Sequence, residues 1–281
     1  MLIEVIPFGG SIDDQGLTYF VQDDLAETMR VGSLVEVPFR SGLDMAIVTR
    51  MNTTETPENL KSIGSFLCSI PLLAPYQVAM IFALSSYYFV HAHQILSLFL
   101  SKGLVKYLEK KNFEGLEMRK SPEQKWSEQI SFIHHTQKTS ISPLIRNYID
   151  DKKEGVAIIF PDDFAIDGFV TDIPTDEKET LIIHDSVTVT RKYKMFTQVY
   201  NGEKNIIIWT RGLLYYNLSH YPHILYVEDA LNKRSMRFQH TYKHLDVVDR
   251  MAQSGLFDIT ILSSLPSIES MYRIHTGGYT Q

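Results

Sequence analysis

The chain has 281 residues, of which 44% are hydrophobic and 21% charged, and its formal net charge is −6. This length suits two domains of ordinary size, and the composition is that of a folded globular protein rather than a disordered one. The negative net charge argues against non-specific electrostatic binding of nucleic acid, although it permits a small pocket that binds nucleic acid specifically. The single cysteine, Cys68, excludes an internal disulfide and a cysteine-cluster zinc site.

Neither a secretory leader nor a membrane span is predicted. The N-terminus lacks the charged start and apolar core of a signal peptide. The most apolar stretch, residues 77–100, is interrupted by serine, tyrosine, histidine and glutamine, so it reads as a pair of core helices. Together with the lone thiol, these features predict a cytoplasmic protein that does not contact membranes.

The first 106 residues have the pattern of a β-rich domain that ends in helices. Alternating or apolar runs predict strands over residues 2–8, 17–21, 32–39 and 44–50, with a turn at Gly9 and Gly10. From residue 57 to about Lys106 the period becomes helical, and Pro75 suits a first helical turn. The predicted fold of residues 1–106 is therefore α+β, a small barrel-like sheet with helices.

Residues 107–129 are polar and charged, have no strand pattern, and are predicted to form a connector. Basic side chains are dense in and just before this segment. Such a row can track the phosphates of a DNA duplex, or it can be an exposed helix with pairs of opposite charge four residues apart. The residues concerned are Lys106, Lys110, Lys111, Arg119, Lys120 and Lys125.

Residues 130–281 alternate between apolar strands and amphipathic helices. The expected strands cover residues 155–160, 179–184, 205–210, 223–229 and 257–263, and the expected helices cover 140–153, 188–201 and 238–253. Alternation of this kind is typical of a parallel sheet that is covered by helices on both faces. The second half is therefore predicted to be an α/β lobe.

Several short motifs of the second half occur in a fixed order. In chain order they are "FPDD" from Phe160 to Asp163, His184, Gly202-Glu203, Thr210-Arg211, an apolar strand followed by Glu228-Asp229, and the segment "SSLPSIES" from Ser263 to Ser270. In this order they resemble the first motor lobe of the primosomal protein N-prime (PriA-like) family of bacterial replication-restart helicases. The resemblance implies a RecA-like fold, and it ends before the family's second motor lobe, so we expect a truncated relative.

The first half is similar to the N-terminal domain of the same family, which captures the 3′ end of a DNA strand. The similarity rests on residues 33–51, 58–77 and 84–96. It places the end-binding residues at Leu17, Thr18, Tyr19 and Lys61. Leucine and threonine stand where the family has a ring and a carboxylate, which implies weaker and less selective end binding. Alternatively, Tyr19 packs in the barrel and Lys61 is a solvated surface charge.

The nucleotide site of the motor lobe is predicted to be degenerate. A phosphate-binding loop needs glycines so that its backbone can turn and approach the phosphates, but only Lys138 and Thr139 remain in "IHHTQKT". Glu228 and Asp229 stand in swapped order at the magnesium box, although a charged pair at a strand end is also common on surfaces. Thr210, Arg211, Ser263 and Ser264 are expected to be remnants of motor motifs. We therefore expect no catalysis and no cofactor.

No metal site is predicted, since His91, His93, His134 and His135 lack a third ligand at a usable spacing. These observations lead to the hypothesis of a non-catalytic DNA-binding adaptor of replication restart or DNA repair. Its expected partners are forked or 3′-ended DNA, and single-strand-binding protein or other primosome components. The alternatives are a protein scaffold that does not bind DNA and an ATPase lobe that a second subunit completes.

Overall fold

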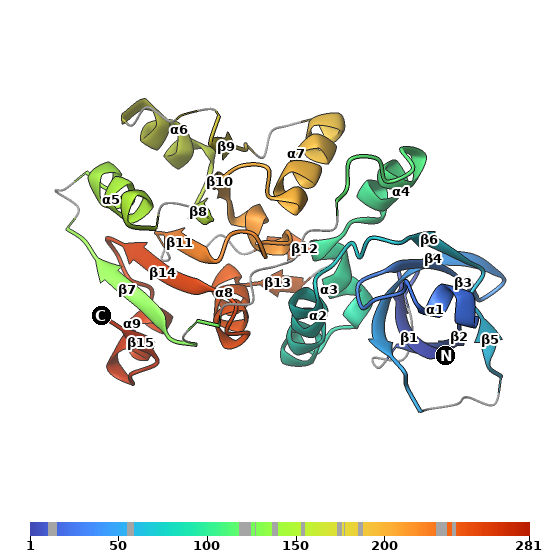
Figure 1. The fold of residues 1–281 in the computed structure, drawn as a ribbon. Coiled ribbons are helices and arrows are strands. Elements are labelled where there is room, and N and C mark those ends of the chain that lie inside the picture. Colours follow the sequence, from blue (N-terminus) through green and yellow to red (C-terminus); the bar gives the residue numbers. More distant parts are fainter. Residues whose placement is uncertain are drawn as a thin grey trace. The chain divides into compact units, whose positions relative to one another are not determined.

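The chain separates into two compact units, Met1–Met118 and Arg119–Gln281, each with its own sheet (Figure 1). The structure is a computed structural model that describes residues 1–10, 16–54, 59–117, 125–126, 128–136, 140–152, 155–172, 176, 178–184, 188–228, 235–237 and 240–281. Among these residues, no helix has the length and apolar character needed to cross a bilayer.

The first unit contains a mixed six-stranded sheet in the order β5-β2-β1-β4-β3-β6. All neighbouring strands are antiparallel except β2 and β5, which run parallel. The strands are β1 (Leu2–Pro7), β2 (Leu17–Phe20), β3 (Leu34–Phe39), β4 (Gly42–Met51), β5 (Lys61–Ser62) and β6 (Ser65–Cys68).

This sheet curls on itself (Figure 1). The Tyr19 hydroxyl on β2 donates a 2.9 Å hydrogen bond to the Pro38 carbonyl on β3, although β1 and β4 lie between these strands in the sheet order. The curl encloses apolar side chains that alternate along the strands, among them Ile3, Val5 and Val35, which are fully buried. The predicted small barrel-like sheet with helices is confirmed.

Four helices complete the first unit: α1 (Asp23–Ala26), α2 (Pro75–Tyr88), α3 (Ala92–Phe99) and α4 (Lys102–Lys110). Pro75 occupies the first turn of α2, as predicted, because a proline there loses no helical hydrogen bond. Ser101 caps α4 by accepting from the Leu104 amide, and Val105 and Leu108 bury its inner face. The predicted domain boundary at residue 106 thus falls inside a helix.

The helical period expected from residue 57 onward is wrong for residues 61–68, which form β5 and β6. Cys68 and Phe66 pair with β3, and Lys61 and Ser62 pair with β2. Pairing with strands already in place decides such short polar segments more than their own propensity does. Gly32 makes room for the chain that follows, since a Cβ there would lie 1.8 Å from the Leu73 carbonyl oxygen.

The second unit is built on seven parallel strands in the order β15-β7-β14-β11-β8-β10-β9. The prediction of a parallel-sheet α/β lobe is confirmed, and the architecture is consistent with a RecA-like lobe. The strands are β7 (Ile130–His134), β8 (Val156–Phe160), β9 (Thr180–Ile182), β10 (Ile206–Thr210), β11 (His223–Val227), β14 (Asp258–Ser263) and β15 (Tyr279–Thr280).

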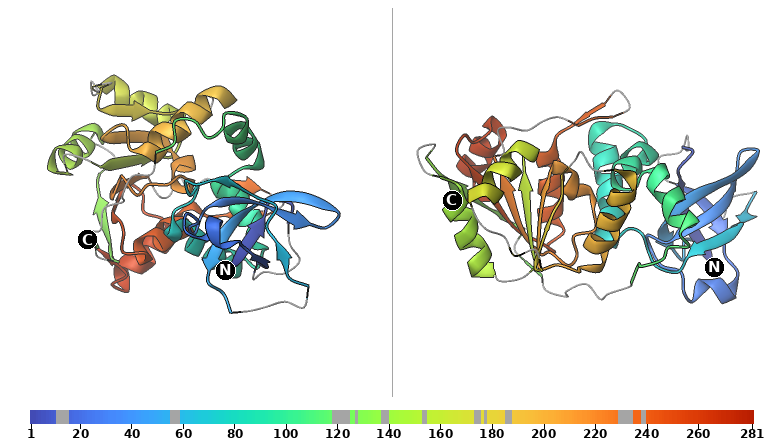
Figure 2. Two further views of the ribbon diagram at one scale, coloured as in Figure 1. Left: turned by 45° about the vertical axis from the view of Figure 1, so that its right-hand side comes forward. Right: turned by 90° about the horizontal axis from the view of Figure 1, so that it is seen from above.

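Helices and a small hairpin connect these strands (Figure 2). They are α5 (Ser142–Lys152), α6 (Asp163–Asp172), α7 (Val189–Asn201), η1 (Arg211–Tyr215), the hairpin β12 (Ser235–Arg237) and β13 (His240–Tyr242), α8 (His244–Gln253) and α9 (Ile268–His275). The helix expected over 238–253 therefore begins later, at His244, because residues 240–242 pair in the hairpin.

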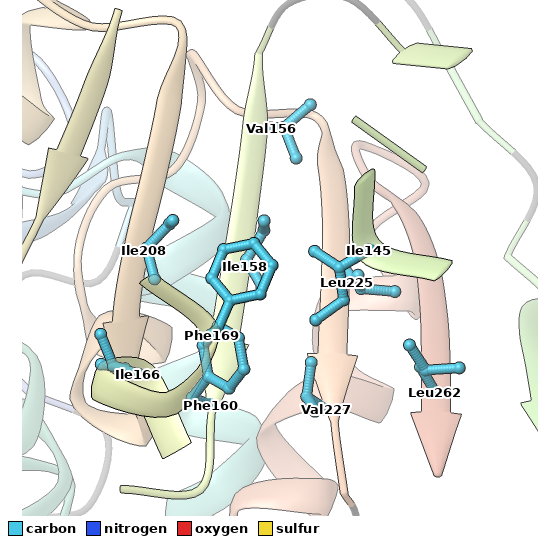
Figure 3. Close-up of a cluster of buried hydrophobic side chains, with 10 residues drawn as sticks. All are labelled: Ile145, Val156, Ile158, Phe160, Ile166, Phe169, Ile208, Leu225, Val227 and Leu262. Atoms are coloured by element: carbon cyan, nitrogen blue, oxygen red, sulfur yellow. The ribbon is translucent and has the colours of Figure 1, made fainter. Parts of the chain in front are cut away.

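The two faces of the parallel sheet carry alternate side chains of each strand. Figure 3 shows Ile158 and Ile208 on one face, where Ile166 and Phe169 of α6 pack against them. Trp209, the next residue of β10, contacts Tyr216, whose ring also meets Phe196 of α7. Strands buried on both faces explain the nearly continuous apolar runs of the sequence.

Candidate functional sites

In the first unit, the structure brings together the predicted end-binding residues at the edge formed by β2 and β5. Tyr19 and Lys61 are direct partners in the parallel register of these strands, and Phe20 is the partner of Ser62. The two positions are 42 residues apart in the sequence. Their adjacency is a property of the fold that no local pattern contains.

Tyr19 itself lies in the core of the barrel. Its side chain is 4% exposed, it packs with Ile3 and Val37, and its hydroxyl donates to the Pro38 carbonyl. Burial raises the pKa of this hydroxyl above its ordinary value. In this conformation the ring stabilises the sheet, and Leu17 packs partly buried against the same core.

The neighbouring positions of this edge are accessible. Thr18 is half-buried opposite Glu4 of β1, Phe20 is 38% exposed, and Lys61 and Ser62 are exposed. We call Thr18, Phe20, Lys61 and Ser62 the β2–β5 edge. Thr18, Phe20 and Ser62 lie on the face opposite to Tyr19, whereas Lys61, the partner of Tyr19, belongs to the other side of the strand pair and is exposed at the edge. The edge thus offers an aromatic ring and two hydroxyl groups on one face and a cation beside them, groups that bind a base, its polar edge and a phosphate.

Phe20 was missed by the sequence reasoning. A usable signal existed, because successive residues of a strand point to opposite faces. If Tyr19 belongs to the core, Thr18 and Phe20 must point the other way.

In the second unit, most of the predicted motor remnants meet at one edge of the sheet. Thr210, Val227 and Ser263 are the last residues of three parallel strands, so Arg211, Glu228 and Ser264 follow at the same edge. Ligands of open parallel sheets bind outside this carboxyl edge. The predicted residues Lys138, Thr139 and Asp229 lie outside the described residues.

The Glu228 carboxylate is the centre of a hydrogen-bond network at this edge. It accepts bonds from the Ser264 amide at 3.2 Å, from the Ser264 hydroxyl at 3.1 Å and from the Ser263 hydroxyl at 3.4 Å. The His135 Nε2 atom lies 3.0 Å from Oε1, the oxygen that also accepts from the Ser264 amide at 3.2 Å. The carboxylate thus ties the ends of β7, β11 and β14 together, and its acceptor positions are engaged within the protein.

Arg211 holds the backbone of the same turn. Its side chain is buried, its guanidinium donates to the carbonyls of Ile159, Val227 and Glu228, and it stacks 3.7 Å from the centre of the Tyr226 ring. Glu228 has a φ of 54°, a left-handed conformation that is costly for a residue with a side chain. The bonds from Arg211 to the adjacent carbonyls stabilise this turn.

The histidines singled out by sequence fall into two pairs, one in each unit. His91 and His93 stack with ring centres 5.7 Å apart in the first unit, whereas His134 and His135 lie in the second. His134 binds the Ser264 carbonyl and His135 binds Glu228. Within the described part of the chain, no three histidine, cysteine or acidic side chains come together as metal ligands.

Comparisons with known proteins give a family match for the N-terminal domain and weak structural likenesses. A search of curated proteins gives no match. The crystal structure of the C-terminal part of the Fun30 ATPase domain is 17% identical, with a TM-score of 0.32, and covers 50% of this chain and 44% of that chain. This chain therefore spans under half of that structure, and the likeness is too slight to support an argument. Residues 7–101 match the PriA 3′ DNA-binding domain (3′BD) family, so the N-terminal domain of this protein is PriA-like.

Proposed function

We propose that this protein is a non-catalytic DNA-binding adaptor of replication restart or DNA repair, and that it recognises forks or 3′ ends of DNA. The observation that carries the proposal is the match of residues 7–101 to the PriA 3′ DNA-binding domain. The β2–β5 edge supports it, since the hydroxyl of Thr18, the ring of Phe20 and the ammonium of Lys61 are accessible on neighbouring strands.

The absence of ATP hydrolysis is part of the proposal. Residues 133–139 contain no glycine, so their backbone amides are hindered from cradling phosphates. Glu228 stands at the position of the magnesium box, and its carboxylate is hydrogen-bonded to Ser263, Ser264 and His135. A carboxylate engaged in this way is poorly placed to hold magnesium or polarise water.

An exposed apolar surface supports the adaptor role. Leu265 is 56% exposed, and on α9 Ile268 is 86%, Met271 54% and Tyr272 68% exposed. The spacing of three and four residues places Ile268, Met271 and Tyr272 on one side of the helix, and Leu265 precedes the helix in the chain. Exposed apolar stripes of this kind are typical of protein–protein contact sites, so we propose that single-strand-binding protein or another primosome component binds here.

A binding titration tests the DNA half of the proposal. The probes are two identical forks, one with a free 3′ arm and one with that arm blocked at its 3′ hydroxyl. We expect the wild type to prefer the free arm, Lys61→Ala and Phe20→Ala to reduce this preference, and Thr18→Asp to sharpen it by supplying a carboxylate for base-edge donors. Base stacking contributes about 1–3 kcal/mol and a charge-assisted phosphate contact about 1.5–3 kcal/mol.

The control is Lys192→Ala, an exposed lysine on α7 in the second unit. Equal binding of both forks by the wild type, with no effect of the Lys61 and Phe20 changes, would refute recognition of the 3′ end. Binding of neither fork would favour the scaffold without DNA binding instead.

A further inference from the structure

Helix α4 carries a row of exposed lysines. Lys102, Lys106 and Lys110 follow one another at intervals of four residues, and Lys111 comes directly after the helix. All four are exposed, whereas Val105 and Leu108 are fully buried on the inner face. A step of four residues returns to the same side of a helix, so the first three lysines lie on one outward stripe about 12 Å long at 1.5 Å per residue.

Within the described part of the chain, the first of these lysines pairs with a carboxylate and the other three do not. The Lys102 ammonium donates to Asp44 at 2.8 Å, which ties the start of α4 to β4. Among the described residues, no carboxylate pairs with Lys106, Lys110 or Lys111. We call these three residues the α4 lysine row. They are cations whose charge is available to a ligand.

The position of this row contrasts with the charge of its surroundings. Residues 1–117 contain eight lysines and arginines against thirteen aspartates and glutamates. Four of the eight cations are Lys102, Lys106, Lys110 and Lys111, and Glu109 is the only acidic residue of α4. Positive charge in an acidic domain is therefore concentrated here, as expected of a surface that meets a polyanion.

The spacing suits a DNA backbone. One strand of a duplex presents a phosphate about every 3.4 Å along the axis, and Lys106 and Lys110 are about 6 Å apart along α4, so the α4 lysine row faces about two or three phosphates. Flexible lysine side chains bind phosphates as point charges and do not require a fixed geometry. Such a surface would bind without regard to sequence, and it would not distinguish a free from a blocked 3′ end.

We propose that the α4 lysine row binds the phosphate backbone of duplex DNA, as a second DNA contact in addition to the β2–β5 edge. The inference rests on the proposed DNA-binding function. It assigns the two contacts different tasks: the β2–β5 edge reads the end of the strand, and the row supplies salt-dependent affinity for the adjoining duplex.

The test is a salt titration of DNA binding between 50 and 200 mM salt, with the free and blocked forks as probes. The variant Lys106→Gln/Lys110→Gln/Lys111→Gln removes the row, and glutamine keeps a comparable helix propensity. Lys178→Gln/Lys192→Gln/Lys194→Gln removes the same charge from exposed positions of the second unit and is the matched control. Circular dichroism verifies that both variants are folded.

We expect the row variant to lose about tenfold or more in affinity for both forks at 0.1 M salt. The slope of log K against log salt should fall by about 2–3, at about 0.9 per phosphate contact. The ratio of free to blocked binding should not change, and the control should keep the wild-type slope.

A row variant with wild-type affinity and slope, or a control that loses as much, would overturn the inference. The inference would also be overturned if the wild type bound polyglutamate, the row variant lost this binding, and both bound DNA equally well. The partner of the row would then be an acidic protein. Failure of end recognition gives a different result: the wild type would bind both forks equally, and the row variant would still lower the salt slope.

Discussion

Replacing Glu228 distinguishes a structural carboxylate from a catalytic one. Glu228→Ala removes the acceptor for the Ser264 amide and hydroxyl, the Ser263 hydroxyl and the His135 ring. Ser263 is fully buried and His135 is 9% exposed, so these groups are left without a partner in a place where water enters poorly.

The expected cost follows from these contacts. A buried polar group left unsatisfied costs about 1–3 kcal/mol, and hydrogen bonds to a charged group contribute about 1.5–3 kcal/mol. The Glu228 side chain is 17% exposed, so water replaces part of what is lost. We expect Glu228→Ala to lower the free energy of unfolding by about 3 kcal/mol. Glu228→Gln keeps one acceptor oxygen and should cost about 1 kcal/mol.

A third variant separates the contribution of the hydrogen-bond network to stability from that of the backbone conformation at residue 228. The φ of 54° at Glu228 costs a residue with a side chain about 1–2 kcal/mol, and glycine avoids this cost. Glu228→Gly should therefore be more stable than Glu228→Ala, by up to about 1 kcal/mol. Glu203→Ala, at an exposed glutamate of the same unit, should have no measurable effect.

Urea unfolding followed by tryptophan fluorescence measures these differences. Both tryptophans, Trp126 and Trp209, belong to the second unit, so the signal reports this unit alone. Phosphate release from ATP is measured in parallel. If Glu228→Ala unfolds at the wild-type urea midpoint and also abolishes DNA-stimulated phosphate release, the carboxylate is a catalytic group and the reasoning is refuted.

Three further predictions concern single substitutions. Lys138→Ala should leave phosphate release at the buffer level, like the wild type; release by the wild type that this change abolishes would demonstrate an active ATPase. Tyr19→Phe should cost about 1 kcal/mol of stability in thermal unfolding, through the lost bond to Pro38, without altering the preference for a free 3′ arm; a changed preference would mean that the hydroxyl contacts DNA. Gly32→Ala should destabilise the first unit by more than about 2 kcal/mol in the same assay, because its φ is 87° and its Cβ would collide with the Leu73 carbonyl; a wild-type melting temperature would contradict this account.

Much of the architecture could be predicted from local patterns. The apolar runs at 156–160 and 206–210 are parallel strands, since a strand covered on both faces must be apolar along its whole length. Pro75 begins a helix because its fixed φ and missing amide suit only the first turn. Both features depend on residues a few positions apart, and the sequence contains them directly.

Tertiary structure decided the features that depend on distant residues. Lys61 and Ser62 form a strand only because β2 offers a partner, and Tyr19 is buried only because the sheet curls toward Pro38. The His135–Glu228 contact joins positions 93 residues apart, at the common edge of two parallel strands. A sequence pattern specifies which side chains are available and in what local conformation, whereas their partners depend on how the chain returns to itself.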